Sequence, residues 1–154
     1  MPSRRELIRM TDAEAEAFLQ EQRTMAVATI GPDGRPHVVA MWYAFVDGAP
    51  CFWTYAKSQK VINLRRDPRI TCMVEAGDTY DTLRGVELIA HAHITDDPDE
   101  VIRFGRIEFE RYQGVPVTEA TLPGVQRMAA KRVVVRLEIE RIVSWDHRKL
   151  AGTY

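Results

Sequence analysis

The clearest pattern in the chain is a regular alternation near its C-terminal end. Four apolar residues alternate with three charged ones: Val133, Val135, Leu137 and Ile139 with Arg136, Glu138 and Glu140. Successive side chains of a strand point to opposite faces of its sheet. The pattern therefore predicts a strand over residues 133–140, with one face in the core and the other in solvent.

Five further runs of apolar and β-branched residues, each bounded by turn residues, predict five more strands. They cover residues 25–30, 37–46, 51–54, 70–74 and 86–95. A Gly-Pro-Asp-Gly-Arg-Pro cluster precedes the second strand, and an Asp-Gly hairpin signal follows it. The second run is apolar on both faces, which predicts a single strand that is buried on both sides.

Three helices are predicted from capping residues and apolar spacing. Thr11 and Glu14 form a capping box at the start of a helix over residues 12–22. Ser58 is the expected N-cap of a short helix that ends at an Asp-Pro pair. Asp97 is the expected cap of a third helix, with a proline in its first turn.

Six strands and three helices that do not alternate with them favour an antiparallel barrel over a parallel sheet. The predicted class is therefore α+β, an antiparallel six-stranded split β-barrel with short flanking helices. The segment 114–130 is expected to be irregular. A chain of 154 residues has the length of one domain, so residues 1–154 are expected to form a single domain.

Composition and charge exclude several classes of function. The chain has 21 basic and 22 acidic residues, so it lacks the basic excess of a broad nucleic-acid-binding face. Its longest apolar run, residues 38–46, is about half a membrane span, and the first thirty residues hold no signal-like apolar segment. Cys51 and Cys72 lack CxxC spacing, which favours free thiols. We expect a cytoplasmic protein without a nucleic-acid or membrane partner.

Common catalytic signatures are mostly absent. The chain has no GxGxxG motif, no phosphate-binding P-loop and no GxSxG motif. His91 and His93 share one face of a predicted strand, but no third ligand stands at a suitable distance, so no metal is expected. Ser144, Asp146 and His147 are too close in sequence for their side chains to form a catalytic relay.

The most informative stretch is residues 53–60, which runs directly into the short predicted helix. Thr54 at a strand end, Ser58 at a helix cap and the ammonium groups of Lys57 and Lys60 would suit a phosphate group. The alternative is a solvated turn with ordinary surface lysines. Spacing alone does not decide between the two interpretations.

The order of several segments resembles the flavin-binding split barrel of the pyridoxamine 5′-phosphate oxidases, and more narrowly the branch that uses the deazaflavin coenzyme F420. The resemblance covers residues 10–150. The segments that carry it are Ala28-Thr29-Ile30, Gly34-Arg35-Pro36-His37-Val38-Val39-Ala40-Met41-Trp42, Trp53-Thr54, residues 58–69, residues 80–86 and residues 143–149.

This resemblance implies where a cofactor would bind. The backbone of Val38, Val39, Ala40 and Met41 would lie along the ring system of the cofactor. Thr54, Ser58 and Lys60 would hold its ribityl phosphate. Two positions depart from the flavin mononucleotide (FMN) oxidases, because Gln59 replaces an arginine and Lys57 replaces a glycine. Loss of a bidentate arginine weakens the binding of a terminal phosphate, and an outward lysine suits a longer anionic tail, so coenzyme F420 is favoured over FMN.

The resemblance also implies a homodimer with each cofactor at the interface. Tyr80, Arg84, Gly85 and Trp145 would then come from the partner chain. Tyrosine, tryptophan and arginine are enriched at protein interfaces, which agrees with that placement.

The expected function is an oxidoreductase that transfers a hydride from reduced coenzyme F420 to an unsaturated small molecule. In such enzymes the cofactor carries the chemistry, so the lack of a catalytic triad is no objection. Trp42, Tyr80 or Trp145 would form walls for the substrate. One alternative is an FMN-dependent oxidase or reductase. Another is a non-catalytic module that binds flavin, deazaflavin or haem, for which the available axial ligands are His37, His91, His93 and His147.

Overall fold

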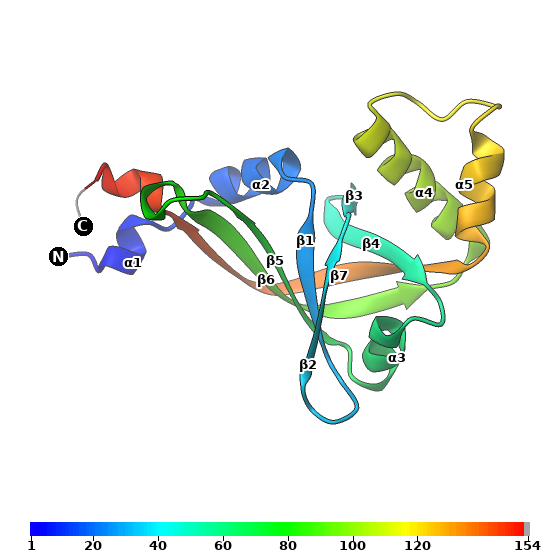
Figure 1. Cartoon of the computed structure of the whole chain (residues 1–154), viewed down its shortest axis with the longest axis horizontal. Coiled ribbons are helices and arrows are strands. Elements are labelled where there is room, and N and C mark those ends of the chain that lie inside the picture. Colours follow the sequence, from blue (N-terminus) through cyan, green and yellow to red (C-terminus); the bar gives the residue numbers. More distant parts are fainter. Residues whose placement is uncertain (153–154) are drawn as a thin grey trace.

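Seven antiparallel strands form one curled sheet in the computed structural model, which describes residues 1–152 (Figure 1). The strands are β1 (Met25–Ile30), β2 (Pro36–Met41), β3 (Ala44–Val46), β4 (Ala49–Tyr55), β5 (Arg69–Ala76), β6 (Arg84–Thr95) and β7 (Arg132–Asp146). Their order in the sheet is β2-β1-β5-β6-β7-β4-β3. The α+β class and the antiparallel pairing are confirmed, but the sheet has seven strands rather than the six predicted.

The additional strand arises because the prediction of one strand over residues 37–46 is wrong. The chain leaves the sheet at Trp42 and Tyr43, between β2 and β3. At this break the Tyr43 N–H donates to the Tyr112 hydroxyl at 2.9 Å, and the same hydroxyl lies 2.9 Å from the Tyr43 carbonyl oxygen. The Tyr112 hydroxyl thus makes the hydrogen bonds with the Tyr43 backbone that a neighbouring strand would otherwise make. Since β2 and β3 lie at opposite edges of the sheet, the sheet must curl into a half-barrel.

The expectation that residues 37–46 are buried on both faces is also wrong. β2 is an edge strand in which exposed and half-buried residues alternate, and the Val38 side chain is 60% exposed. Full burial is reached only at Tyr43, within the break, and at Ala44, where β3 begins. An apolar run at a sheet edge has a second, outward face, and sequence periodicity does not show whether that face is covered.

The main core lies inside the half-barrel. The strands contribute Val27, Phe52, Cys72, Val74, Val86, Leu88, Val135 and Leu137 to it. Helix α2 (Asp12–Glu21) adds Phe18 and Leu19, and helix α3 (Gln59–Arg66) adds Leu64. The alternation predicted for β7 is confirmed from Val135 onward, because Val135 and Leu137 are buried while Arg136 and Glu138 are exposed. At the start of the strand Val134 is buried as well, since both faces of the sheet are covered there.

All three predicted helices are present. In α2 the capping box of Thr11 and Glu14 is formed. Helix α4 (Pro98–Gln113) starts at Asp97, whose carboxylate accepts hydrogen bonds from the first turn. The remaining helices were not predicted: α1 (Arg4–Leu7), α5 (Leu122–Ala129) and the short 3₁₀ helices η1 (Tyr80–Thr82) and η2 (His147–Leu150).

Helix α5 corrects the expectation that the segment 114–130 is irregular. Its Pro-Gly pair resembles a turn in sequence, but here the proline occupies the first helical turn. α5 packs against α4, and Ala129 joins a second core with Trp53, Phe104 and Val134. This second core lies outside the half-barrel, on the other face of β4.

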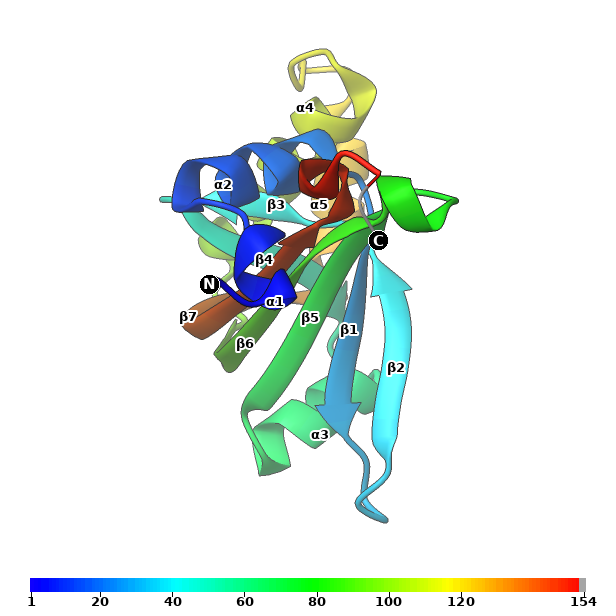
Figure 2. The same ribbon diagram turned by 90° about the vertical axis from the view of Figure 1, so that its left-hand side faces the viewer.

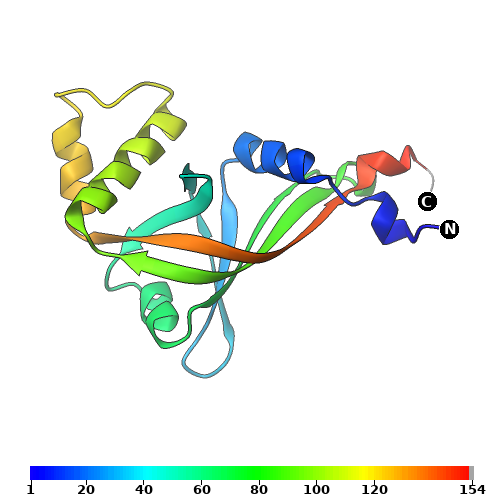
Figure 3. The same cartoon turned by 180° about the vertical axis from the view of Figure 1, so that it is seen from behind.

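The molecule therefore has two distinct ends. α3, α4 and α5 lie toward one end, whereas α1, η1, η2 and the termini lie at the other (Figures 1 and 3). Seen from the second end, β1 and β2 form a long hairpin at the open side of the sheet (Figure 2). None of the helices in residues 1–152 is long and apolar enough to cross a bilayer.

Candidate functional site

The residues considered for cofactor binding fall into three groups in the structure. One group lies where β4 leads into α3, a second is the edge strand β2, and a third lies where β6 begins and β7 ends. The first and third groups are at opposite ends of the molecule (Figure 1). A single chain therefore does not bring all of the predicted residues together.

The first group contains a compact polar cluster formed by Thr54, Ser58 and Lys60. Thr54 is almost fully buried at the end of β4, on the face that points into the half-barrel. The Lys60 ammonium donates to the Thr54 Oγ1 at 2.9 Å, and the Ser58 Oγ lies 3.4 Å from the same atom. Ser58 is the N-cap residue of α3, but its side chain makes no capping hydrogen bond. Its hydroxyl is therefore directed to the cluster rather than to the helix.

The charge of Lys60 has no acidic partner among residues 1–152. Its ammonium is half-buried, and this burial lowers the pKa of Lys60 because the charged form loses solvation. One of its three N–H bonds is used by Thr54. A partly desolvated cation beside two hydroxyls and the free N–H groups of a helix start provides the chemistry of an anion site.

A buried asparagine, which the sequence analysis missed, fastens the helix that carries Lys60 to β1. Asn63 of α3 is fully buried, and its Nδ2 donates to the Thr29 Oγ1 of β1 at 3.0 Å. Its Oδ1 accepts from the Gln59 Nε2 at 2.8 Å. Arg66 adds a hydrogen bond to the Ile30 carbonyl oxygen. The only sequence signal was a polar residue among the apolar positions of the short helix.

Gln59 and Lys57 do not join the cluster. The Gln59 amide turns along α3 toward Asn63, away from Thr54. The Lys57 side chain is exposed and lines a pocket between β4, α4 and α5, with Tyr55 beside it. The two lysines of the predicted phosphate site thus face different parts of the molecule.

The second group is the free edge of the sheet. In the described chain, β2 pairs only with β1, so the backbone groups on its other side have no strand partner. Val38 and Ala40 are exposed, while Val39 and Met41 pack against the main core. Beyond this edge, the half-exposed Trp42 ring stacks on the Tyr112 ring, with centroids 4.2 Å apart.

The third group is held by close packing across β6 and β7. Gly85 and Trp145 are paired in register, and a Cβ atom added to Gly85 would lie 2.3 Å from the Trp145 Cζ2. Only glycine leaves room for the indole here. Beside this pair, the rings of Tyr80 and His147 meet edge to face, with centroids 4.6 Å apart.

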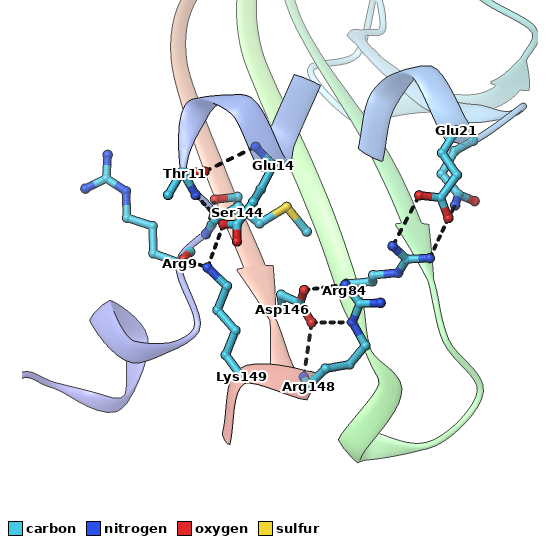
Figure 4. A network of polar contacts seen from close by, with 11 residues as sticks. Arg9, Thr11, Glu14, Glu21, Arg84, Ser144, Asp146, Arg148 and Lys149 are labelled. Carbon is cyan, nitrogen blue, oxygen red and sulfur yellow. Dashed lines mark hydrogen bonds and ion pairs between the residues drawn. The ribbon is translucent and has the colours of Figure 1, made fainter. Parts of the chain in front are cut away.

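Ion pairs fasten this end of the sheet to α2 (Figure 4). Arg84 pairs with Glu21 at 2.7 Å and lies over the Phe18 ring. The Arg84 guanidinium lowers the pKa of Glu21. Lys149 pairs with Glu14 in the same way at 2.6 Å. Within one chain, Arg84 is therefore bound to Glu21. Any contact of Arg84 with a cofactor would have to form alongside this ion pair.

The remaining candidate motifs are occupied by local contacts. His91 pairs with Glu140 and His93 with Glu138 on the exposed faces of β6 and β7. No group of three or more metal-ligating side chains is assembled in residues 1–152. The Ser144 hydroxyl accepts from the Met10 N–H at 3.1 Å, and the Asp146 carboxylate is bound by Arg148.

Several solved structures share the fold of this chain. The conserved hypothetical protein Rv2991 from Mycobacterium tuberculosis is 49% identical, with a TM-score of 0.91, over 99% of this chain and 95% of its own. An F420 reductase is 28% identical, with a TM-score of 0.64, over 82% of this chain and 94% of its own. The haem storage protein HutZ from Vibrio cholerae shares the fold at 18% identity and a TM-score of 0.68, over 86% of this chain and 94% of its own.

A search of curated proteins finds no match to this chain. The sequence profile of the pyridoxamine 5′-phosphate oxidase family, in contrast, matches residues 11–146. That range contains all seven strands described above, the Thr54, Ser58 and Lys60 cluster, and the Gly85 and Trp145 pair. The chain belongs to the pyridoxamine 5′-phosphate oxidase family.

Proposed function

We propose that this protein is an oxidoreductase that binds coenzyme F420 and transfers a hydride from its reduced form to an unsaturated small molecule. The observation that carries the proposal is the half-buried Lys60 ammonium, which lacks an acidic partner in the described chain and lies beside the hydroxyls of Thr54 and Ser58. This cluster fits a phosphate group, which would supply the missing negative charge. The family and the F420 reductase among the similar structures support a flavin-type cofactor.

The choice of coenzyme F420 over FMN rests on the donors that the cluster offers. It holds one ammonium and two hydroxyls, and Gln59 is bonded to Asn63 instead of extending toward Thr54. A terminal phosphate monoester is best held by a bidentate guanidinium, which is lacking at this position. A phosphodiester carries less charge and needs fewer donors, so the cluster suits coenzyme F420 better.

The free edge of β2 would bind the ring system. Its unpaired N–H and C=O groups at residues 38–41 could hydrogen-bond the polar edge of a deazaflavin. Bound in its reduced form, coenzyme F420 would supply a hydride to an unsaturated bond of the substrate, and a proton from solvent would complete the reduced product. Trp42 lies next to this edge, where its half-exposed ring could contact the substrate.

The proposal includes a homodimer in which Tyr80, Arg84, Gly85 and Trp145 approach the cofactor bound by the partner chain. Two observations support it. The start of β6 and the end of β7, which carry Arg84, Gly85 and Trp145, lie at the opposite end of the molecule from α3 (Figure 1). Val38 and Met73 are also exposed, on the face of the sheet that points away from the main core. A monomer by light scattering at micromolar concentration would remove this part of the proposal. The proposal also places the protein in the reducing cytosol, where its two buried free thiols would persist.

Fluorescence titration of the purified protein with coenzyme F420 and with FMN tests the assignment. We expect coenzyme F420 to bind more tightly than FMN. The variant Gln59→Arg should reduce this difference in affinity, because it restores a charged donor pair for the FMN phosphate. Preference of the wild type for FMN would replace the assignment by a flavin oxidase. The absorption spectrum of the protein as purified gives an independent readout, because a Soret band would indicate haem binding instead.

A further inference from the structure

A large pocket lies on the side of β4 that faces away from the half-barrel. Its volume is about 870 Å³, and it is enclosed by the end of β4, the first turn of α4, the end of α5 and the loop before α3. Its apolar walls are formed by Val101, Ile102, Ala129 and Val133. The volume is within the range of about 300–1,000 Å³ that is usual for small-molecule sites.

The pocket is separate from the Thr54, Ser58 and Lys60 cluster. Neighbouring side chains of β4 point to opposite faces of the sheet. Phe52 belongs to the core of the half-barrel, and Thr54 shares its face. Trp53 belongs instead to the second core beside α4, and Tyr55 on that same face lines the pocket. Thr54 and Tyr55 therefore point to opposite faces of β4, and none of Thr54, Ser58 and Lys60 lines the pocket.

Positive charge is concentrated around this pocket, although the chain as a whole carries a net charge of −1. Four cations line it, namely Lys57, Arg65, Lys131 and Arg132, against the single acid Asp96. In the described chain, Lys57, Arg65 and Lys131 take part in none of the ion pairs. Unpaired cations above apolar walls attract an anionic group whose apolar body enters the pocket.

The fourth cation is held in a fixed position at the edge of the pocket. The Arg132 guanidinium donates to the Met128 carbonyl oxygen at 2.9 Å. It lies over the Tyr55 ring, 4.3 Å from the centroid, and over the Trp53 ring at 5.1 Å. This stack gives the pocket a flat, rigid and positively charged edge, which suits an aromatic or conjugated ligand.

We propose that the pocket between β4, α4 and α5 is a second binding site, which takes a small amphipathic anion with an apolar or aromatic body and one carboxylate or sulfonate group. The apolar walls would receive the body of the ligand. Arg65 and Lys131 would neutralise its acid group at the rim. The site does not depend on the identity of the cofactor, because it shares none of the residues Thr54, Ser58 and Lys60.

Two fluorescent probes that differ only by a charged sulfonate group test this site. One is the anion 8-anilinonaphthalene-1-sulfonate, and the other is its neutral analogue N-phenyl-1-naphthylamine. We expect the wild type to bind the anion more tightly. The double variant Arg65→Met/Lys131→Met should raise the Kd of the anion roughly tenfold and change that of the neutral probe by less than about twofold. Ala130→Phe, a change at an exposed position of the rim, should weaken the binding of both probes because the larger side chain would fill part of the pocket.

The matched control is Arg35→Met/Arg106→Met, which removes the same charge at exposed positions outside the pocket and should leave both affinities unchanged. Equal loss of the anion in the control and in the Arg65→Met/Lys131→Met variant would overturn the proposal, as would binding that survives Ala130→Phe. Displacement of the probe by coenzyme F420 would also overturn it, because the pocket would then belong to the cofactor site. Failure of coenzyme F420 to bind, with probe binding intact, would refute only the proposed function.

Discussion

Replacement of Glu108 by glutamine should change the pH dependence of stability. Glu108 is a buried residue of α4, and its carboxyl accepts a hydrogen bond from the Trp53 indole. Burial raises its pKa to about 7, although the Trp53 N–H and the nearby Arg132 charge both act in the opposite direction. Glutamine keeps the shape and the acceptor for Trp53 but has no proton to lose.

The magnitude follows from the difference between the two states. In the unfolded chain the carboxyl titrates near its ordinary pKa of 4.5, and in the folded chain near 7. Between these values the folded state holds the proton more tightly, so the stability of the wild type falls as pH rises through this window. The shift corresponds to about 3 kcal/mol at pH 8 relative to pH 4. Glu108→Gln lacks this loss and should be more stable than the wild type at pH 8 by up to that amount.

Urea unfolding at pH 5 and pH 8, followed by tryptophan fluorescence, measures the effect. The control is Glu119→Gln, which neutralises an exposed glutamate in the loop after α4. We expect the difference in the free energy of unfolding between Glu108→Gln and the wild type to grow from pH 5 to pH 8. The control variant should show the same pH dependence as the wild type. If the free energy of unfolding changed with pH by the same amount in Glu108→Gln and in the wild type, the argument that Glu108 carries an uncompensated buried charge would be wrong.

Three further substitutions test individual contacts. Gly85→Ala places a Cβ against the Trp145 indole, so it should lower the free energy of unfolding in urea by about 1–3 kcal/mol. In a Trp145→Ala background the same change should cost much less, because the indole is gone. Tyr112→Phe leaves the Tyr43 N–H without its partner and should cost about 1–3 kcal/mol, whereas Tyr55→Phe at an exposed position should have little effect. Lys60→Met should raise the Kd for coenzyme F420 roughly tenfold in a fluorescence titration, while Arg106→Met at an exposed position of α4 should not.

The sequence correctly predicted those elements that are determined by residues close together in the chain. The period-two pattern predicted β7, and the capping box of Thr11 and Glu14 predicted the start of α2. The break between β2 and β3 depends on the Tyr112 hydroxyl, which is supplied from 69 residues further along the chain. No local pattern contains such a contact, so the run of apolar residues was interpreted as one strand.

The candidate site was predictable to a similar extent. Thr54, Ser58 and Lys60 are close in sequence, and the structure brings them together. Lys57 belongs to the same turn, but it faces the other side because neighbouring residues diverge where a strand ends. Asn63 and Glu108 were missed although each is a polar residue on an otherwise apolar helix face. Such residues deserve to be treated as candidates for buried hydrogen bonds.

A crystal structure of the protein with coenzyme F420 would test the proposed cofactor site most directly. We predict that the cofactor phosphate lies within hydrogen-bonding distance of the Lys60 Nζ and of the Thr54 or Ser58 hydroxyl, with its ring along residues 38–41 of β2. A phosphate bound in the pocket between β4, α4 and α5, or at Arg84 of the same chain, would contradict the assignment.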